Sequence, residues 1–471
     1  MLPLLAMAFA LAQPEARTAW RVVVTSDGVV AGRIGETRGP DGRESVTEQS
    51  FVIQERGDTA TRIVQRTVTR RDTDGRVSEI VDERRTGRSV TTTEVRLSAG
   101  RADIVQRSPA GRPRRTAVAL PPDIRFDNGM GLLPGWNPAA APELTFAALN
   151  IDALAVERVV IAPAPVQESV PVGGRALIRR SYDGDALRGV QLLLLDADGR
   201  VVETRQPIFG TVMSIRAATP AEATAPLVPY RPLQRALVSS PFRIPSRALT
   251  GHIRYRFTYR DGIAFPLPGT GEQSVAPGAD GATIDICTEC GVGLSATPEA
   301  LTAARRPTAW LQSDSSIIRD LARNAASMGV SDARKMQTLV EVAERQITEI
   351  DFAGHFSAAE AAMRRRGDCT ESAALLAALG RAAGIPTKVA SGLVYSREAY
   401  HGTANVFLPH SWVLAYVGGR WRSFDAALGN FDATHIALSV GDGDPRSIAA
   451  ANQLAGLIVW REMQEVRRRP D

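Results

Sequence analysis

Asp-Gly pairs punctuate the first half of the chain, and they constrain its fold more than any other feature. They occur at positions 27–28, 41–42, 74–75, 183–184 and 198–199. Glycine tolerates the positive φ of a tight type I′ turn, so each pair predicts an antiparallel hairpin. Neighbouring segments such as 61–68 and 176–179 are rich in β-branched and apolar residues, which favour strands. Residues 17–216 are therefore predicted to form an antiparallel β-domain.

Beyond this region the sequence pattern changes twice. Residues 217–239 are rich in proline and are predicted to be an extended linker. Residues 240–296 contain the alternating segment 253–259 and are predicted to form a small β-unit. From residue 297 the apolar residues follow a helical period, and strand patterns come after it. The sequence thus predicts a multidomain protein in which all-β antiparallel domains precede an α+β domain at 297–471.

The N-terminus, MLPLLAMAFALAQ, is a short apolar run that ends in small residues around Ala10 and Ala12. This pattern predicts a signal peptide over residues 1–16 and a periplasmic or secreted protein, although no charged residue precedes Glu15. A buried first strand is the alternative, but the run lacks period-2 alternation. No apolar stretch is long enough to predict a transmembrane segment.

Composition narrows the classes of partner and cofactor. The formal net charge is only +5, and no nucleic-acid motif or glycine-rich phosphate loop is found, so we expect neither nucleic acid nor a nucleotide cofactor. Lys335 and Lys388 are the only lysines in the sequence, which makes the basic surface almost wholly arginine. Nothing in the sequence indicates a cofactor or an oligomeric state.

Cys369 occupies a position that favours reactivity. Asp368 is predicted to be the N-cap of a helix of about 15 residues, with Cys369 as its first residue. A thiol at the positive end of a helix dipole is expected to have a lowered pKa. A buried, inert thiol is the alternative.

A histidine and an aspartate flank a predicted hairpin farther along the chain. His410 begins an apolar strand, Gly418-Gly419 forms the turn, and Asp425 ends the returning strand. His410 lies eight residues before the turn and Asp425 six residues after it, so both are expected at one end of the hairpin. A nucleophile needs such a base and a group that orients the base.

These residues stand in blocks that resemble the transglutaminase-like superfamily. The blocks are RGDCTE at 366–371, RAAGIP at 381–386, HSW at 410–412, and Trp421 followed four residues later by Asp425. The resemblance covers roughly residues 300–471. It implies a papain-like Cys–His–Asp order, with Cys369 as nucleophile, His410 as general base and Asp425 as orienting residue. The family often has proline after the aspartate, whereas Ala426 stands here.

The resemblance implies acyl transfer through a thioester but does not identify a substrate; we expect a peptide or protein. Hydrolysis by a protease or amidase is favoured over transamidation, because water is abundant and no amine site is recognisable in the sequence. Two alternatives stay open. One is a non-catalytic periplasmic scaffold with a vestigial triad, and the other is a carrier whose N-terminal sheet binds a lipid or peptide.

Further side chains near these blocks are candidates for the substrate cleft. Glu371 could be the capping-box partner of Asp368 or a nearby acid. Trp412 shares a strand face with His410 and could line the cleft or belong to the core. His401, in a predicted loop, could lie at the rim of the cleft or be solvated. A second capping box is predicted from Ser357 to Glu360.

The two remaining cysteines form a Cys-x-x-Cys motif, Cys287 and Cys290. With no second such motif and no histidine pair nearby, four local zinc ligands cannot be assembled. In an oxidising compartment a local disulfide is the expected state, and two free thiols come next. No metal site is predicted.

Overall fold

A computed structural model describes residues 18–54, 60–109, 112–126, 142–165, 170–208, 211–231, 237–350, 355–398 and 403–466. The predicted signal peptide and His401 lie outside these residues. No helix in the described ranges combines the length and the apolar character needed to span a membrane.

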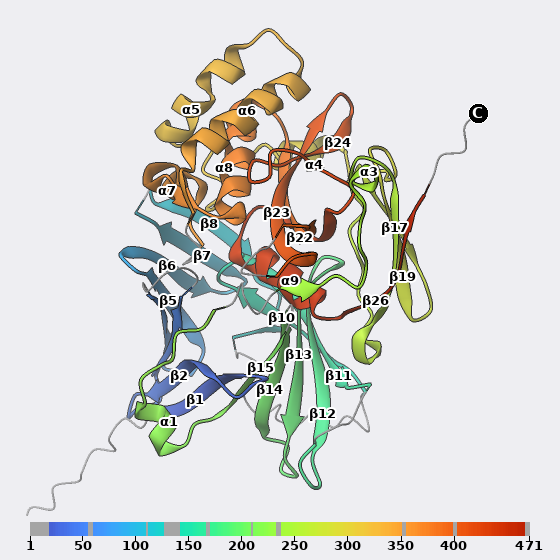
Figure 1. Cartoon of the computed structure of the whole chain (residues 1–471). Helices are drawn as coiled ribbons and strands as arrows, with labels where there is room; N and C mark the ends of the chain where they lie inside the picture. Colours follow the sequence, from blue (N-terminus) through green and yellow to red (C-terminus); the bar gives the residue numbers. More distant parts are fainter. Residues whose placement is uncertain are drawn as a thin grey trace, which may run out of the picture.

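The N-terminal region is all-β, as predicted, and forms one large sheet (Figure 1). Strands β1 to β8 form one run in which neighbours in sequence pair with each other, and strands β9 to β15 form a second such run. The two runs are joined where β1 pairs with β15. All neighbours are antiparallel except β9 and β10. The strands are β1 (Thr18–Thr25), β2 (Val30–Arg38), β3 (Glu44–Ile53), β4 (Thr61–Arg71), β5 (Val77–Thr86), β6 (Ser89–Ser98), β7 (Arg101–Arg107), β8 (Arg114–Ala119), β9 (Ile124–Arg125), β10 (Leu144–Asn150), β11 (Ala155–Pro163), β12 (Arg175–Asp183), β13 (Ala186–Leu195), β14 (Val201–Ile208) and β15 (Thr211–Ala217).

The Asp-Gly pairs form turns between consecutive antiparallel strands of this sheet. Their glycines all have the positive φ that the sequence predicts, with values of 84° at Gly28, 72° at Gly42, 79° at Gly75, 57° at Gly184 and 78° at Gly199. The hairpin prediction is therefore confirmed at every one of these pairs. The predicted type I′ geometry is wrong, because the aspartate before each glycine does not have the positive φ that such a turn requires.

The predicted linker is not a free segment. It contains the short helix α1 (Pro220–Thr224), which has a complete capping box, and the buried Tyr230, whose backbone bonds to Val52 and Gln54 beside β3. Its end, β16 (Val238–Ser239), pairs with a strand of the C-terminal sheet. The segment thus joins the two sheets by packing against both.

Two smaller sheets follow. The first consists of β17 (Ile253–Tyr259), β18 (Gln273–Pro277), β19 (Gly281–Ile286) and β26 (Ile458–Glu465). Since β26 comes from the end of the chain, residues 240–296 do not build this sheet alone. The second combines β16 with β22 (Thr387–Ser396), β23 (Val406–Val417), β24 (Arg420–Phe424) and β25 (Ile436–Gly441). A minimal parallel pair, β20 (Glu349–Ile350) and β21 (Arg366–Gly367), precedes it.

Helices complete the α+β domain. One of them, α8, packs on β22 and β23 and is surrounded by α5, α6 and α7, and almost all of its side chains are buried (Figure 1). Alanines along α8 permit this close approach. The helices that follow the linker are α3 (Ser246–Leu249), η1 (Arg260–Gly262), α4 (Pro298–Ala303), α5 (Ser316–Ser327), α6 (Asp332–Gln346), α7 (Ala358–Arg364), α8 (Cys369–Ala382) and α9 (Pro445–Ala455).

A continuous hydrophobic core connects the large sheet with both smaller ones. It includes Ile178 of β12, Tyr255 of β17, Phe407 of β23 and Leu454 of α9. Helix α9 lies between β13 of the large sheet and β25 of the C-terminal sheet (Figure 1). The N-terminal region is thus packed directly against the α+β domain.

The capping box predicted at Ser357 is wrong. Ser357 precedes α7, but its side chain makes no capping hydrogen bond. Glu360 instead accepts hydrogen bonds from Ser89 Oγ of the large sheet, at 2.5 Å, and from Arg364 Nε, at 2.9 Å. A hydrogen bond between the large sheet and α7 therefore takes the place of the predicted capping hydrogen bond.

Candidate active site

Cys369 is the first residue of α8, as predicted. Asp368 is the N-cap, and its carboxylate accepts a hydrogen bond from the Thr370 backbone N–H at 2.7 Å. Glu371 completes the capping box, because its Oε2 accepts from the Asp368 backbone N–H at 2.9 Å. This double cap fixes the backbone on both sides of the cysteine.

The thiol of Cys369 does not have the lowered pKa that its helix position predicts. Burial raises the pKa well above its ordinary value, and the neighbouring carboxyl of Asp368 raises it further, while a hydrogen bond from the Ser411 backbone acts in the opposite direction. Desolvation and nearby negative charge thus favour the neutral thiol form of Cys369.

His410 and Asp425 form a direct pair. Strands β23 and β24 pair in the register Val413 opposite Phe424, which brings both residues to the end of the hairpin away from its turn. His410 Nε2 lies 2.7 Å from Asp425 Oδ2, and the two residues are 4% and 2% exposed. The Ser411 backbone bond to Cys369 places the thiol beside the residue that follows His410. With Nε2 engaged by Asp425, the Nδ1 nitrogen of His410 is the one left for another partner.

His435, which the sequence analysis did not single out, extends this pair. Its Nε2 lies 3.1 Å from the same oxygen of Asp425, and its Nδ1 lies 3.1 Å from Asp432 Oδ1. Burial lowers the pKa of His435, but the hydrogen bonds to Asp425 and Asp432 outweigh it and raise the pKa to about 9. His435 is therefore buried between two carboxylates, which favour its protonated form.

The Asp425 carboxylate is held by four donors. Its Oδ2 faces the two histidines, and its Oδ1 accepts from the backbone N–H groups of Ala427 at 2.8 Å and Leu428 at 3.1 Å. Although burial raises the pKa of Asp425, the hydrogen bonds from His410 and His435 dominate and hold it well below its usual range. Asp425 is therefore ionised and fixed in orientation.

The three predicted cleft residues have different positions. Trp412 is 1% exposed, and its ring stacks on His410 with centroids 6.2 Å apart. Its indole Nε1 has no hydrogen-bond partner within the described part of the chain. Glu371 is fully buried. Both side chains are therefore packed beneath the surface, and His401 lies outside the described residues.

Glu371 and Asp368 place two carboxyl groups behind Cys369. Burial raises the pKa of both carboxyls, and that of Glu371 rises well above its usual range, with Asp368 as the second cause. Glu371 also accepts a hydrogen bond from the Phe356 backbone N–H at 2.9 Å. Burial and the neighbouring carboxyl thus favour the protonated form of Glu371.

Two cavities are relevant to binding. One of about 350 Å³ is lined by Asp425 together with residues of α6, such as Glu341 and Glu344, and by residues 429–431. The other, of about 400 Å³, lies between apolar residues of the large sheet, such as Ile178 and Leu192, and the η1 region, and it touches none of the three predicted catalytic residues.

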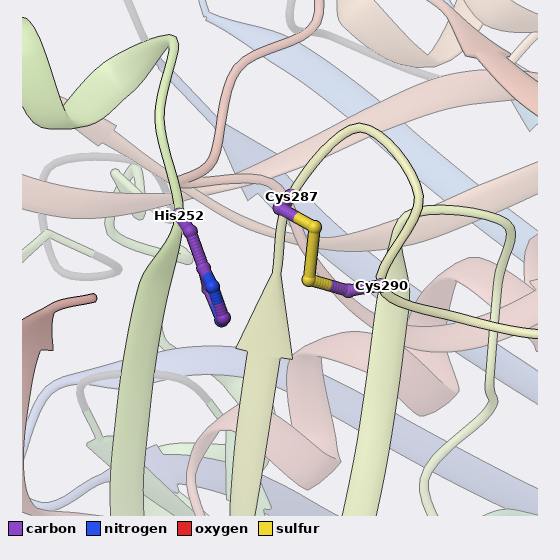
Figure 2. Close-up of side chains that lie close together, drawn as sticks. All are labelled: His252, Cys287 and Cys290. Carbon is purple, nitrogen blue, oxygen red and sulfur yellow. A yellow bond between two sulfur atoms is a disulfide. The ribbon is translucent and has the colours of Figure 1, made fainter. Parts of the chain in front are cut away.

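Cys287 and Cys290 are joined in a disulfide (Figure 2). It lies at one end of the sheet that contains β17 and β19, and it belongs to a different part of the domain from Cys369. The structure leaves Cys369 as the free cysteine.

Comparison with known proteins identifies the C-terminal region. Residues 319–426 match the family model of the transglutaminase-like superfamily, and the match includes Cys369, His410 and Asp425. No curated protein matches the chain.

Several solved structures are similar at low identity. A candidate cysteine protease from Cytophaga hutchinsonii is 18% identical, over 45% of this chain and 87% of its own, with a TM-score of 0.28. A β-barrel-like protein of a domain of unknown function from Brucella abortus is 14% identical, over 43% and 96%, with a TM-score of 0.33. A candidate protease from Parabacteroides distasonis is 13% identical, over 92% and 72%, with a TM-score of 0.23.

The family match, the α+β architecture and the order of the four sequence blocks agree with one another. The C-terminal third of the chain contains a transglutaminase-like domain, and a large all-β region precedes it.

Proposed function

We propose that the C-terminal domain is a cysteine-dependent hydrolase of peptide or protein amides. The observation that carries the proposal is the placement of Cys369 at the start of α8, beside the buried His410–Asp425 pair. The family match over these residues favours acyl-transfer chemistry.

The first half of the reaction forms a thioester. His410 takes the proton of the Cys369 thiol, and the sulfur attacks the amide carbonyl carbon to form a C–S bond. The backbone N–H of Cys369, at the helix start, is placed to donate to the developing oxyanion. The C–N bond then breaks, and His410 returns the proton to the leaving amine.

The second half releases the acyl group. His410 removes a proton from water, and the resulting hydroxide attacks the thioester carbon. The C–S bond breaks, a carboxylic acid leaves, and the proton on His410 returns to the Cys369 sulfur. An amine in place of water would give a new amide, which is the transamidation alternative.

The neutral resting thiol gives His410 an essential part in this scheme. Because the pKa of Cys369 is raised, a spontaneous thiolate is scarce at neutral pH, and proton transfer to His410 must accompany attack. Asp425 holds the His410 ring in the tautomer that has its proton on Nε2, which leaves the Nδ1 lone pair free to accept the thiol proton.

Hydrolysis is proposed over transamidation because water is present at high concentration and the sequence has no recognisable amine-binding motif. If the N-terminus directs export, as its sequence predicts, dilute extracellular amines would strengthen this preference. A peptide segment is the proposed substrate class.

The test uses the full-length protein with a peptide library, in the presence and absence of a millimolar primary amine. We expect free acids as the dominant products, and no product from Cys369→Ala. Amine-capped products in excess over acids would show a transamidase. An absence of any product, together with a Cys369 that no alkylating reagent modifies, would show a non-catalytic protein with a vestigial triad.

A further inference from the structure

His252 lies beside the Cys287–Cys290 disulfide although 35 residues separate it from Cys287 in sequence (Figure 2). The strand register explains this proximity. Ile253 of β17 pairs with Ile286 of β19, so the residue before β17 and the residue after β19 occupy the same end of the sheet. His252 is far from the two cysteines in sequence, and the pairing of β17 with β19 brings it to them.

The three side chains bring possible ligand atoms close together. One nitrogen of His252 and the sulfurs of Cys287 and Cys290 all lie within 4.8 Å of one another. Two thiolates and an imidazole are the ligands that Zn²⁺ prefers, and a Cys-x-x-Cys spacing is typical of zinc sites. The same spacing also allows the disulfide seen here.

Asp285 prepares His252 for metal binding. His252 Nε2 lies 2.6 Å from Asp285 Oδ1, so the Nε2–H tautomer donates to the carboxylate and the lone pair remains on Nδ1. Metal-binding histidines commonly use their second nitrogen in this way. Asp285 is fixed in turn by Arg254, whose Nε and terminal nitrogen lie 2.9 and 3.2 Å from its oxygens.

The surrounding charges match a divalent cation. Two thiolates and Asp285 carry three negative charges, and Arg254 carries one positive charge. A divalent cation would bring the cluster to neutrality. All three ligand residues are half-buried, so the site is reachable from solvent.

Backbone contacts hold both cysteines in place without the disulfide. The Cys287 N–H donates to the Glu272 carbonyl at 3.1 Å, and the Gly291 N–H donates to the Gly271 carbonyl at 3.2 Å. Between them, Arg420 bonds to the Thr288 carbonyl at 3.3 Å and to Glu289 at 2.6 Å. Reduction therefore needs only a rotation of the two sulfurs, from bonded contact to the roughly 3.7 Å that separates two zinc-bound thiolates.

We propose that the dithiol form of this protein binds one zinc-type divalent cation through Cys287, Cys290 and His252 Nδ1, with water as the fourth ligand. A two-electron reductant, such as a dithiol or a phosphine, cleaves the S–S bond and leaves two thiols. Metal binding then releases their two protons. The disulfide and the metal-bound form are alternative states of one site.

The experiment compares oxidised and phosphine-reduced full-length protein, without oxygen, in a Cys369→Ala background that removes the third thiol. Zn²⁺ alone is added, free ion is removed, and bound zinc is measured with a chromophoric chelator. Co²⁺ is then used as a spectroscopic probe of tetrahedral thiolate ligation. We expect one ion per reduced chain, essentially none per oxidised chain, and thiolate-to-cobalt charge-transfer absorption.

Variants separate this site from simple chelation by two thiols. His252→Ala is expected to weaken zinc binding at least tenfold, and Asp285→Asn by about tenfold, whereas Cys287→Ser with Cys290→Ser abolishes it. His355→Ala, which removes a histidine elsewhere, is the matched control and should not change the affinity. Circular dichroism of the oxidised variants verifies folding. Equal zinc binding by reduced and oxidised protein, or an unchanged affinity in His252→Ala, would overturn the proposal.

Discussion

His410 and His435 approach the same carboxylate oxygen, Oδ2 of Asp425, at 2.7 and 3.1 Å. The far nitrogen of His435 faces Asp432 at 3.1 Å, so His435 lies between two carboxylates, which raise its pKa to about 9. The hydrogen bonds from His410 and His435 hold the pKa of Asp425 well below its usual range, and Asp425 in turn orients His410. Under the proposed mechanism, His435 is a positioning residue that does not touch the substrate.

Replacement of His435 should give a pH-dependent loss of stability. The pKa of His435 rises from 6.5 to about 9 on folding, so its charged form stabilises the folded protein. That contribution is complete below pH 6.5 and declines as the pH rises to about 9, where it is lost. His435→Gln should therefore reduce the free energy of unfolding by a few kcal/mol at pH 6 and by much less at pH 9.5, as measured by urea denaturation.

His355 provides the control for this experiment. Its side chain is 11% exposed, and desolvation and the nearby Arg84 lower its pKa to about 3, so it is neutral throughout this pH range. The stability difference between wild type and His355→Gln should therefore stay constant from pH 7 to pH 9.5. A His435→Gln deficit that is equally constant would show that His435 is not charged in the folded protein.

Alkylation of Cys369 should depend on His410. Because burial and Asp368 raise the pKa of the thiol, few thiolates form without a base. Iodoacetamide labelling at pH 7 should thus be about 100-fold slower in His410→Ala than in wild type, and the two rates should converge as the pH rises. Mass spectrometry of the Cys369 peptide gives both rates. Equal rates at pH 7 would mean that His410 does not accept the thiol proton.

Replacement of the acid behind the nucleophile should cost less with an amide than with alanine. The two oxygens of Glu371 each accept one backbone hydrogen bond, Oε2 from Asp368 and Oε1 from Phe356. Glu371→Gln keeps one acceptor and turns an NH2 group toward the other donor, so it should cost about 1–2 kcal/mol at pH 7, whereas Glu371→Ala leaves two buried donors unpaired and should cost about 2–4 kcal/mol. Chemical denaturation measures both variants.

The pH dependence of these variants gives a second readout. The folded pKa of Glu371 is raised, so the folded state binds a proton that the unfolded chain has released above about pH 4.5. Wild-type stability therefore falls, relative to Glu371→Gln, as the pH increases beyond that value. A wild-type advantage that grows with pH would mean that Glu371 is ionised.

Local features of this protein could be predicted from its sequence. The Asp-Gly turns and the Asp368 cap depend on residues that are adjacent in the chain, so their chemistry is visible in the sequence. The pairing of His410 with Asp425 follows from one short hairpin. The family match places the α+β domain in the same region as the resemblance did.

Non-local features could not be predicted in this way. His435 lies only three residues after its partner Asp432, but only the assembled structure brings it to Asp425. Similarly, His252 reaches the disulfide through strand pairing, and β26 returns from the end of the chain to complete that sheet. The raised pKa of Cys369 depends on burial, which the helix position alone does not reveal.

The large sheet and the α+β domain should unfold as one unit. Arg446 of α9 reaches Glu157 of β11, with its Nε 3.2 Å from Oε1, and the two side chains are 18% and 5% exposed. Arg446→Met would leave the Glu157 carboxylate buried without its charge partner, at an expected cost of about 3–5 kcal/mol. Because a common core joins the two regions, calorimetry should show one transition that moves as a whole to lower temperature.

Adding Glu157→Gln to Arg446→Met should recover part of the loss, since no unpaired charge remains. The surface variant Arg461→Met is the control and should have an effect of less than about 0.5 kcal/mol. Two separate transitions, with only one affected by Arg446→Met, would show that the regions are independent domains.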